Sequence, residues 1–254
     1  MRFGTYGALV VSCGLFAGAL GAAAAPIAHD SFSYPDGDLA GAGDGVGWVG
    51  AWHDVHPDGT PKTFVVAPGL EYADDDGLRL ATAGSQVGIA YDTSRKIDLD
   101  TASRPELAYV VADGKLGRDR SSVWISLLAR CESGYGWSVV ELNAGAREQV
   151  KLCHAGDSEY WAFIDTATRE TDTPVTEPVF MLVRIDFRAD DDAIHLWIDP
   201  SLASEPGAET ADATGAYPDA TFDTVVIRGD STDETYIDEL RIGTTWADVC
   251  PPKE

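Results

Sequence analysis

Basic residues are scarce in this sequence. Its 254 residues include 18 Lys and Arg against 42 Asp and Glu, which gives a formal net charge of −24. A surface of this sign repels phosphate backbones and anionic lipids, so nucleic acid and membrane surfaces are not expected as partners. The acidic residues are spread along the chain rather than collected in a tail, so the charge does not indicate disorder. It favours divalent cations instead.

Cysteine is also rare, and its spacing is unlike that of a zinc site. Three of the four cysteines lie beyond the N-terminal segment, namely Cys131, Cys153 and Cys250. The sequence contains no C-x-x-C and no paired Cys/His cluster. An odd count leaves at least one thiol unpaired. A Cys131–Cys153 disulfide and three free buried thiols are both compatible with the sequence.

Long hydrophobic runs are absent except near the N-terminus, where an uncharged run extends from Gly7 to Ala25. Arg2 precedes this run, and small residues followed by Pro26 close it. This order is typical of a signal peptide that is cleaved after Ala24 or Ala25. We therefore expect residues 1–25 to be removed and the mature chain to be secreted, periplasmic or exposed at the cell surface.

Two alternatives for the N-terminal segment involve a membrane. An uncleaved anchor would need about 18 or more strongly apolar residues, whereas much of this run is Gly and Ala. A lipid anchor is the other alternative, because the V-V-S-C sequence that ends at Cys13 is similar to a bacterial lipoprotein cleavage site. No second apolar run follows, so no transmembrane segment is expected in the mature chain.

Helical periodicity is almost absent beyond the signal segment. Short apolar or alternating runs, about 8–12 residues apart and separated by turn residues, are typical of an all-β sandwich or barrel. We predict one domain over residues 26–254, with Pro200–Pro218 as a long loop and a short turn at Thr244–Val249. The expected strands are Trp48–His53, Lys62–Ala67, Leu78–Ala81, Gln86–Tyr91, Glu106–Ala112, Val123–Cys131, Tyr135–Leu142, Glu148–Cys153, Tyr160–Asp165, Val179–Arg188, Ala193–Asp199, Phe222–Arg228 and Tyr236–Ile242.

Alternation along the expected strands separates an apolar face from a polar and aromatic one. In Val123–Cys131, the apolar side chains share one face, and Trp124 and Arg130 lie on the other. If Arg130 and Tyr135 close a four-residue turn, Trp124 stands opposite Glu141 on the next strand. The sequence thus predicts that neighbouring strands turn the same mixed face away from the core.

The hairpin formed by Val179–Arg188 and Ala193–Asp199 repeats this pattern, with Asp186 and His195 on its outer face. Aromatic rings stack on sugar rings, while Arg and carboxylate groups bond the hydroxyls, so such a face suits a glycan. An ordinary solvated sheet face is the alternative. The candidate ligand-binding residues are Trp124, Arg130, Trp137, Glu141, Arg184 and Trp197.

Four stretches carry a resemblance to a known superfamily. They are D-S-F-S-Y-P-D-G at 30–37, G-W-V-G-A-W at 47–52, L-W-I-D-P at 196–200 and Y-I-D-E-L-R-I-G-T-T-W at 236–246. Together they resemble secreted concanavalin A-like (LamG-like) jelly rolls. The resemblance implies two packed antiparallel β-sheets with adjacent N- and C-terminal strands, and it leaves the activity open.

The same resemblance implies a structural calcium ion near the two termini. The matching positions are Asp238 on the last strand and Asp30 near the first. Calcium takes six to eight oxygen ligands, so one ion could join both termini. The alternative is that Asp238 pairs with Arg241 or caps a turn.

Catalytic motifs are missing as well. The E-x-D-x-x-E strand motif of the superfamily's glucanases does not occur, since Glu141 has no carboxylate partner at Asn143 or Ala144. Neither G-x-S-x-G nor a phosphate-binding loop is present. We therefore expect a non-enzymatic, lectin-like protein that binds a glycan or cell-surface polysaccharide. The alternatives are a divergent glycoside hydrolase or polysaccharide lyase, and a structural envelope or adhesion protein.

Overall fold

The computed structural model describes residues 25–54, 63–89, 93–132, 137–154, 158–176, 178–229 and 235–253. The predicted signal segment, apart from Ala25, lies outside these residues. Within them, no helix is both long enough and apolar enough to cross a membrane. The chain is almost entirely β-structure, which confirms the predicted all-β class.

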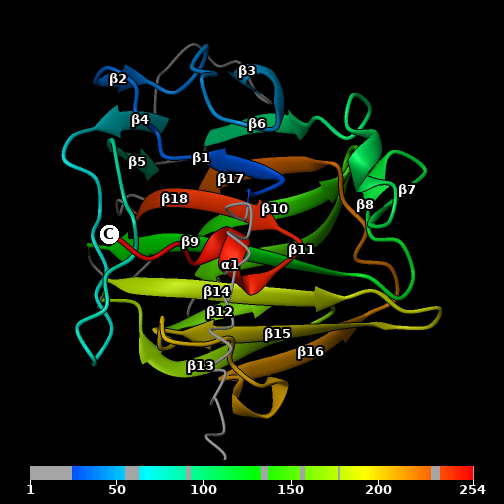
Figure 1. Ribbon diagram of the computed structural model, residues 1–254. Coiled ribbons are helices and arrows are strands. Elements are labelled where there is room, and N and C mark those ends of the chain that lie inside the picture. Colours follow the sequence, from blue (N-terminus) through cyan, green and yellow to red (C-terminus); the bar gives the residue numbers. More distant parts are fainter. Residues whose placement is uncertain are drawn as a thin grey trace, which may run out of the picture.

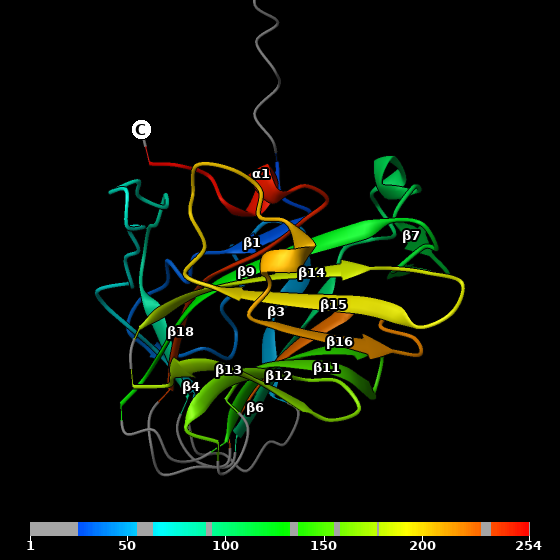
Figure 2. The same cartoon turned by 90° about the horizontal axis from the view of Figure 1, so that it is seen from below.

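Two antiparallel sheets form a sandwich, as Figures 1 and 2 show. One sheet, the nine-stranded sheet, has the order β16-β15-β14-β9-β18-β5-β4-β2, and β1 pairs with β18 outside this path. Its strands are β1 (Ala28–Asp30), β2 (Gly37–Asp38), β4 (Thr63–Val66), β5 (Gln86–Ile89), β9 (Ser122–Cys131), β14 (Val179–Asp186), β15 (Asp192–Ile198), β16 (Ala213–Tyr217) and β18 (Thr235–Gly243).

The second sheet, the seven-stranded sheet, has the order β13-β12-β11-β10-β17-β6-β3. The pairing of β1 with β18 confirms the expected adjacency of the terminal strands. A small hairpin of β7 (Val111–Ala112) and β8 (Lys115–Leu116) lies apart from both sheets. The strands of the seven-stranded sheet are β3 (Trp48–Asp54), β6 (Thr93–Leu99), β10 (Ser138–Ala144), β11 (Arg147–His154), β12 (Tyr160–Ile164), β13 (Thr168–Pro174) and β17 (Thr224–Gly229).

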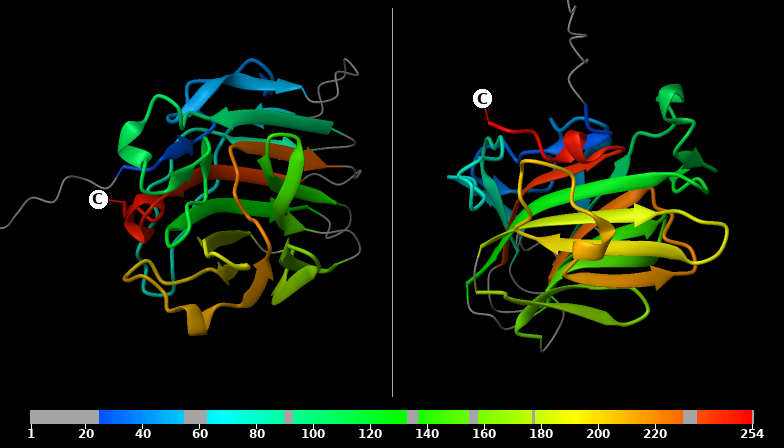
Figure 3. Two further views of the ribbon diagram at one scale, coloured as in Figure 1. Left: turned by 90° about the vertical axis from the view of Figure 1, so that its right-hand side faces the viewer. Right: turned by 60° about the horizontal axis from the view of Figure 1, so that its bottom comes forward.

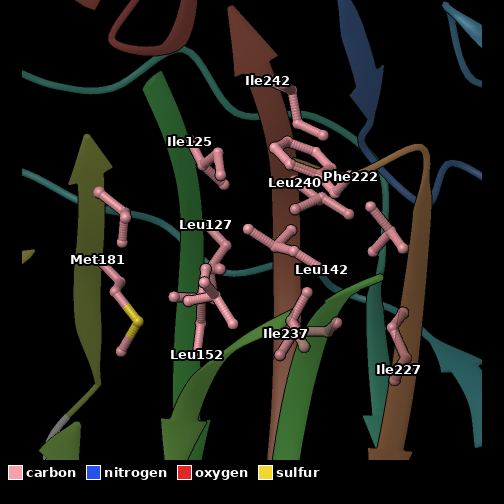
Figure 4. Close-up of a cluster of buried hydrophobic side chains, with 14 of the residues drawn as sticks. Ile125, Leu127, Leu142, Leu152, Met181, Phe222, Ile227, Ile237, Leu240 and Ile242 are labelled. Carbon is pink, nitrogen blue, oxygen red and sulfur yellow. The ribbon is translucent and has the colours of Figure 1, made fainter. Parts of the chain in front are cut away.

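The core lies between the sheets and follows the predicted alternation. Ile125 and Leu127 of β9 meet Leu142 of β10 and Leu152 of β11, and all four side chains are fully buried (Figure 4). Burial of apolar area is the main term that favours folding, at about 25 cal/mol per Å². Each strand's inward face is therefore determined by its own sequence.

A second apolar cluster covers the outer face of the nine-stranded sheet. It includes Trp124, Trp197 and Phe180 from the sheet, with Val249 of α1 (Trp246–Val249) packed on them. This helix lies across β9 and β18 in Figure 1, and β1 and the C-terminal segment lie on the same side of the molecule in Figure 3. Thr245 caps α1 through its side chain, which is a local reason for a helix at the expected turn.

Several strand predictions were wrong. Leu78–Ala81 forms only isolated bridges, and Glu106–Ala112 begins in a 3₁₀-helix, Pro105–Leu107, because Pro105 occupies the first turn and cannot pair in a sheet. The predicted loop Pro200–Pro218 contains strand β16 and a second 3₁₀-helix, Ala208–Thr210. Strands β6 and β13 were missed because they are rich in polar residues.

The cysteines do not form the bridge that the sequence left open. Cys131 and Cys250 are free and buried. The predicted alternative of a Cys131–Cys153 disulfide is therefore wrong, because Cys131, the last residue of β9, is free. Burial raises the pKa of Cys250 to about 12, so its thiol stays protonated and unreactive at neutral pH.

Candidate functional site

The predicted polar and aromatic face is divided between the two sheets. Strand β9 pairs with β14 and β18, whereas β10 pairs with β11 and β17. Trp124 stands opposite Arg184 and Glu141 opposite Lys151, so the predicted Trp124–Glu141 pair is wrong. The chain crosses from one sheet to the other between β9 and β10. Because both strands alternate in the same way, local pattern does not distinguish this crossing from a hairpin.

Four of the six predicted ligand-binding residues lie in the nine-stranded sheet, and two of them are covered. The rings of Trp124 and Trp197 are 3% and 2% exposed and stack on each other at a centroid distance of 5.6 Å. Thr210 accepts a hydrogen bond from the Trp197 indole at 3.1 Å. Both tryptophans belong to the outer apolar cluster, so their ring faces contact protein rather than solvent.

The two predicted arginines of this sheet, Arg130 and Arg184, are half-buried and contact neighbouring side chains. Arg184 lies 5.5 Å from the Trp124 ring centroid and donates to Asp186 at 2.7 Å. As predicted, Asp186 shares this face with His195 and Trp197 of the paired strand β15. Arg130 lies over the Tyr236 ring at 4.6 Å, some way along β9. These contacts make the outer face of the nine-stranded sheet a packed layer.

The other two predicted residues, Trp137 and Glu141, lie on the seven-stranded sheet within a charged cluster. Glu141 of β10 is 2% exposed, and it lies between Lys151 of β11 and Arg228 of β17. The Glu141 carboxylate is 3.6 Å from Lys151 Nζ and 3.5 Å from Arg228 Nη1. We call this set the Glu141 cluster; its members are Trp137, Glu141, Asn143, Glu148, Lys151 and Arg228.

Glu148 closes the Glu141 cluster towards solvent. Its carboxylate is 2.7 Å from Lys151 Nζ and 3.0 Å from Arg228 Nη1, and 45% of its side chain is exposed. Each of the two cations therefore contacts both carboxylates. Since Lys151 Nζ lies within 3.6 Å of one carboxylate and 2.7 Å of the other, the nearest oxygens of Glu141 and Glu148 are at most about 6 Å apart.

Trp137 lies beside the same two cations. Its ring centroid is 5.0 Å from Lys151 Nζ and 5.2 Å from the guanidinium carbon of Arg228. Cations at this distance are attracted by the negative face of the ring. Unlike Trp124, Trp137 is only partly buried. An accessible aromatic ring therefore lies beside a set of charged hydrogen-bonding groups.

The environments of the two carboxyls move their pKa values in opposite directions. Burial raises the pKa of Glu141, and repulsion by Glu148 adds to this, against the attraction of Lys151 and Arg228. The hydrogen bond from Lys151 lowers the pKa of Glu148. A proton added to the cluster therefore goes to Glu141 first, and Glu148 remains the carboxylate.

Two amides on the same hairpin have spare hydrogen-bonding capacity. Asn143 donates to Glu141 at 3.4 Å, while its Oδ1 has no partner among the described residues. Both amide atoms of Gln149, which is 4% exposed, also lack one there. Buried polar atoms are nearly always bonded to protein or water. The residues around Glu141 can thus both donate and accept bonds at one place on the sheet.

Sequence reasoning missed Glu148, Lys151, Asn143 and Arg228. The first three had a local signal, because the turn at Ala144–Arg147 closes a hairpin that sets Glu141 opposite Lys151. The predicted turn between Arg130 and Tyr135 paired Glu141 with Trp124 instead, and this hid the signal. Arg228 had no local signal, since β17 reaches β10 from more than 80 positions away.

The two residues predicted to bind calcium, Asp30 and Asp238, lie on the paired strands β1 and β18 and accept hydrogen bonds from protein donors. Asp30 accepts hydrogen bonds from Phe32 N at 2.9 Å, Tyr34 Oη at 2.8 Å and Trp52 Nε1 at 2.8 Å. Asp238 accepts from two backbone N–H groups. Protein donors thus hold both carboxylates in place. Within the described residues, no group of three or more His, Cys, Asp or Glu could hold a metal. Calcium binding itself stays an untested prediction.

Comparison with known proteins adds little to this geometry. No family model and no curated protein matches the sequence. Among solved structures, the globular domain of T. cruzi calreticulin is 13% identical over 78% of this chain and 86% of its own, with a TM-score of 0.44. A beta-1,3-glucanase from Mycobacterium marinum is 12% identical, over 85% of this chain and 98% of its own, at 0.37. The VIP36 exoplasmic/lumenal domain, in a Ca²⁺/Man3GlcNAc-bound form, is 8% identical over 85% and 95%, at 0.39. Similarities this low carry no argument about function.

Proposed function

We propose that this protein binds a polysaccharide on the outer face of the seven-stranded sheet, at the Glu141 cluster. The observation that carries this proposal is the contact of partly exposed Trp137 with Lys151 and Arg228, which in turn hold Glu141 and Glu148. Sugars present an apolar ring face and a rim of hydroxyls, so they need an aromatic ring beside charged donors and acceptors. The Glu141 cluster supplies both within one patch.

The side chains of the Glu141 cluster contact one another before any ligand is bound. Its charged groups come from three adjacent strands, β10, β11 and β17, and their side chains are cross-linked by ion pairs. Groups held in place before binding lose less conformational entropy when the ligand arrives. Export through the N-terminal segment is part of the same proposal, because it would bring the protein to extracellular polysaccharides.

Hydrolysis at the same face is the second candidate function. Two observations favour it: Glu141 and Glu148 are close enough to contact the same two cations, and their pKa values move in opposite directions. In that reaction, Glu141 would be the acid that protonates the leaving oxygen and Glu148 the opposing carboxylate. The missing E-x-D-x-x-E motif places this function second.

A glycan array probed with the protein, with and without calcium, tests the first function. Arg228→Gln should weaken binding about tenfold or more, because it breaks contacts with both carboxylates and with Trp137. Arg184→Gln is the matched control, since Arg184 makes the same kinds of contact on the opposite face. The proposal would be overturned if the protein bound no polymer at all, or if both variants lost the same amount of binding affinity.

Release of reducing ends from each bound polymer tests the second function. A hydrolase should lose this activity in both Glu141→Gln and Glu148→Gln while both variants still fold. A binding protein should release no sugar even when wild type. The two functions are thus separated by one assay on the same samples.

A further inference from the structure

A pocket of about 230 Å³ lies far from the Glu141 cluster in the fold, beside β1 and the C-terminal segment. It is below the size of a site for a drug-sized ligand, so its occupant must be small. Proline and alanine side chains provide apolar walls, and four ionisable side chains, those of His29, Glu239, Arg241 and Asp248, provide polarity. Its lining includes Pro26, His29, Ala83, Glu239, Arg241 and Pro251.

Three side chains in this pocket form a connected ionic group. The Glu239 side chain is fully buried and contacts His29 Nε2 at 2.7 Å and Arg241 Nη2 at 2.5 Å through one oxygen. The backbone N–H of Ala83 donates to its other oxygen. Arg241 Nη2 also donates to the carbonyl of Ala81. Both carboxylate oxygens of Glu239 are therefore already in use.

The backbone at Glu239 is in a conformation that non-glycine residues rarely adopt. Its φ is 52°, and the register of β18 with β9 shifts between Asp238 and Arg241. Strain of this kind persists only where the surrounding structure enforces it, and it concentrates at binding and catalytic sites. Here it accompanies a buried carboxylate that holds both a histidine and an arginine.

The remaining hydrogen-bonding capacity defines the ligand chemistry. Arg241 is 3% exposed, and its Nη1 has no partner among the described residues, so a donor is left over. A carboxylate only accepts, so His29 Nε2 donates to Glu239 and the ring's other nitrogen, Nδ1, is not used in this contact. The unused donor of Arg241 and the ring of His29 both line this pocket, and they suit hydroxyl groups, which donate as well as accept.

Charge argues for a neutral ligand. Glu239 already balances Arg241, and the carboxyl of Asp248, which accepts from Thr244 N and Thr245 N, also lines the pocket. An anion would therefore meet carboxylates as well as the guanidinium. We infer that this pocket is a binding site for a small neutral polyhydroxy compound, of the size of a monosaccharide, held between Arg241 and His29.

NMR titration with individual sugars tests this inference on the intact protein. Glucose, galactose, mannose and N-acetylglucosamine serve as neutral probes, with glucuronate and acetate as charged ones. At least one neutral sugar should shift the ring signals of His29 and the side-chain signals of Arg241, with a Kd of roughly millimolar order. No shift with any neutral sugar up to about 100 mM, or shifts with the anions alone, would overturn the inference.

A pocket-filling variant distinguishes binding from a purely structural ionic group. Ala83→Leu adds volume at the exposed rim without removing any charged partner and should weaken the sugar response about tenfold or more. Ala102→Leu, at an exposed turn outside the pocket, is the matched control and should leave it unchanged. An undiminished response in a folded Ala83→Leu protein would place the sugar elsewhere and overturn the inference.

Discussion

Asp238 illustrates how far the environment of a single residue departs from what its sequence context suggests. The carboxyl is fully buried in β18 and accepts hydrogen bonds from Leu70 N at 2.8 Å and Glu239 N at 2.7 Å. Burial, and then repulsion by Glu239, raise its pKa to about 8. The sequence made Asp238 a candidate calcium ligand. In the structure, its hydrogen bond with Leu70 N joins the segment around Leu70 to β18.

The raised pKa of Asp238 predicts a pH dependence of stability. Between about pH 4 and pH 8, the folded protein keeps a proton on this carboxyl that the unfolded chain has lost, so the free energy of unfolding falls as pH rises. Asp238→Asn removes the titrating group and should flatten this fall. Urea denaturation at several pH values measures it.

The control for that experiment is Asp172→Asn, at an exposed position of β13. This variant should keep the wild-type pH profile. If wild type and Asp238→Asn showed parallel profiles from pH 4 to 8, the carboxyl of Asp238 would not be protonated in the folded state.

At the scale of elements, the two sheets have opposite kinds of outer face. The nine-stranded sheet carries a second apolar cluster under α1, and the seven-stranded sheet carries the Glu141 cluster. Strands that bury both faces, such as β14, have hydrophobic residues at most positions. The edge strands β13 and β16 consist mostly of polar or small residues, and backbone pairing holds them in the sheets. Their sequences therefore lack the apolar alternation by which strands were predicted.

This difference predicts contrasting effects for two tryptophan truncations. Trp197→Ala removes a ring that is 2% exposed and should lower the free energy of unfolding by about 3–5 kcal/mol. Trp137→Ala removes a partly exposed ring and should cost much less. Chemical denaturation provides both values.

Polysaccharide binding should follow the reverse order. Trp137→Ala should lose it, and Trp197→Ala should keep it under conditions where the variant remains folded. A loss of binding confined to Trp197→Ala would move the glycan site to the nine-stranded sheet.

At the scale of the whole molecule, the formal charge of −24 opposes the compact state through self-repulsion. Added salt should therefore stabilise the folded protein. Raising the ionic strength from about 10 mM to 150 mM shortens the Debye length from about 30 Å to 8 Å. We expect Tm to rise by about 3 °C, which corresponds to about 1 kcal/mol for a chain of this size.

Calcium and magnesium chloride at equal ionic strength provide the control. Equal shifts indicate screening alone, while a larger shift with calcium would reveal a specific calcium site. A fall in Tm with added sodium chloride would contradict the electrostatic account.

Composition and local pattern were enough to predict the fold class and the side chains of each strand that face the core. Ile125, Leu127 and Leu142 were recognised as core residues because a two-residue period follows from the geometry of a strand. The acidic balance is likewise a property of composition. The hairpin of β14 and β15 was predicted because its partners are neighbours along the chain.

The strands that share a sheet, and therefore the polar groups that meet, could be identified only from the tertiary structure. Trp124 and Trp137 have the same local pattern, yet one ring is sealed beneath α1 and the other lies beside Lys151 and Arg228. Arg228 reaches Glu141 because β17 pairs with β10 across a long separation in sequence. Such pairings depend on how apolar faces are buried throughout the molecule, and local alternation contains no information about them.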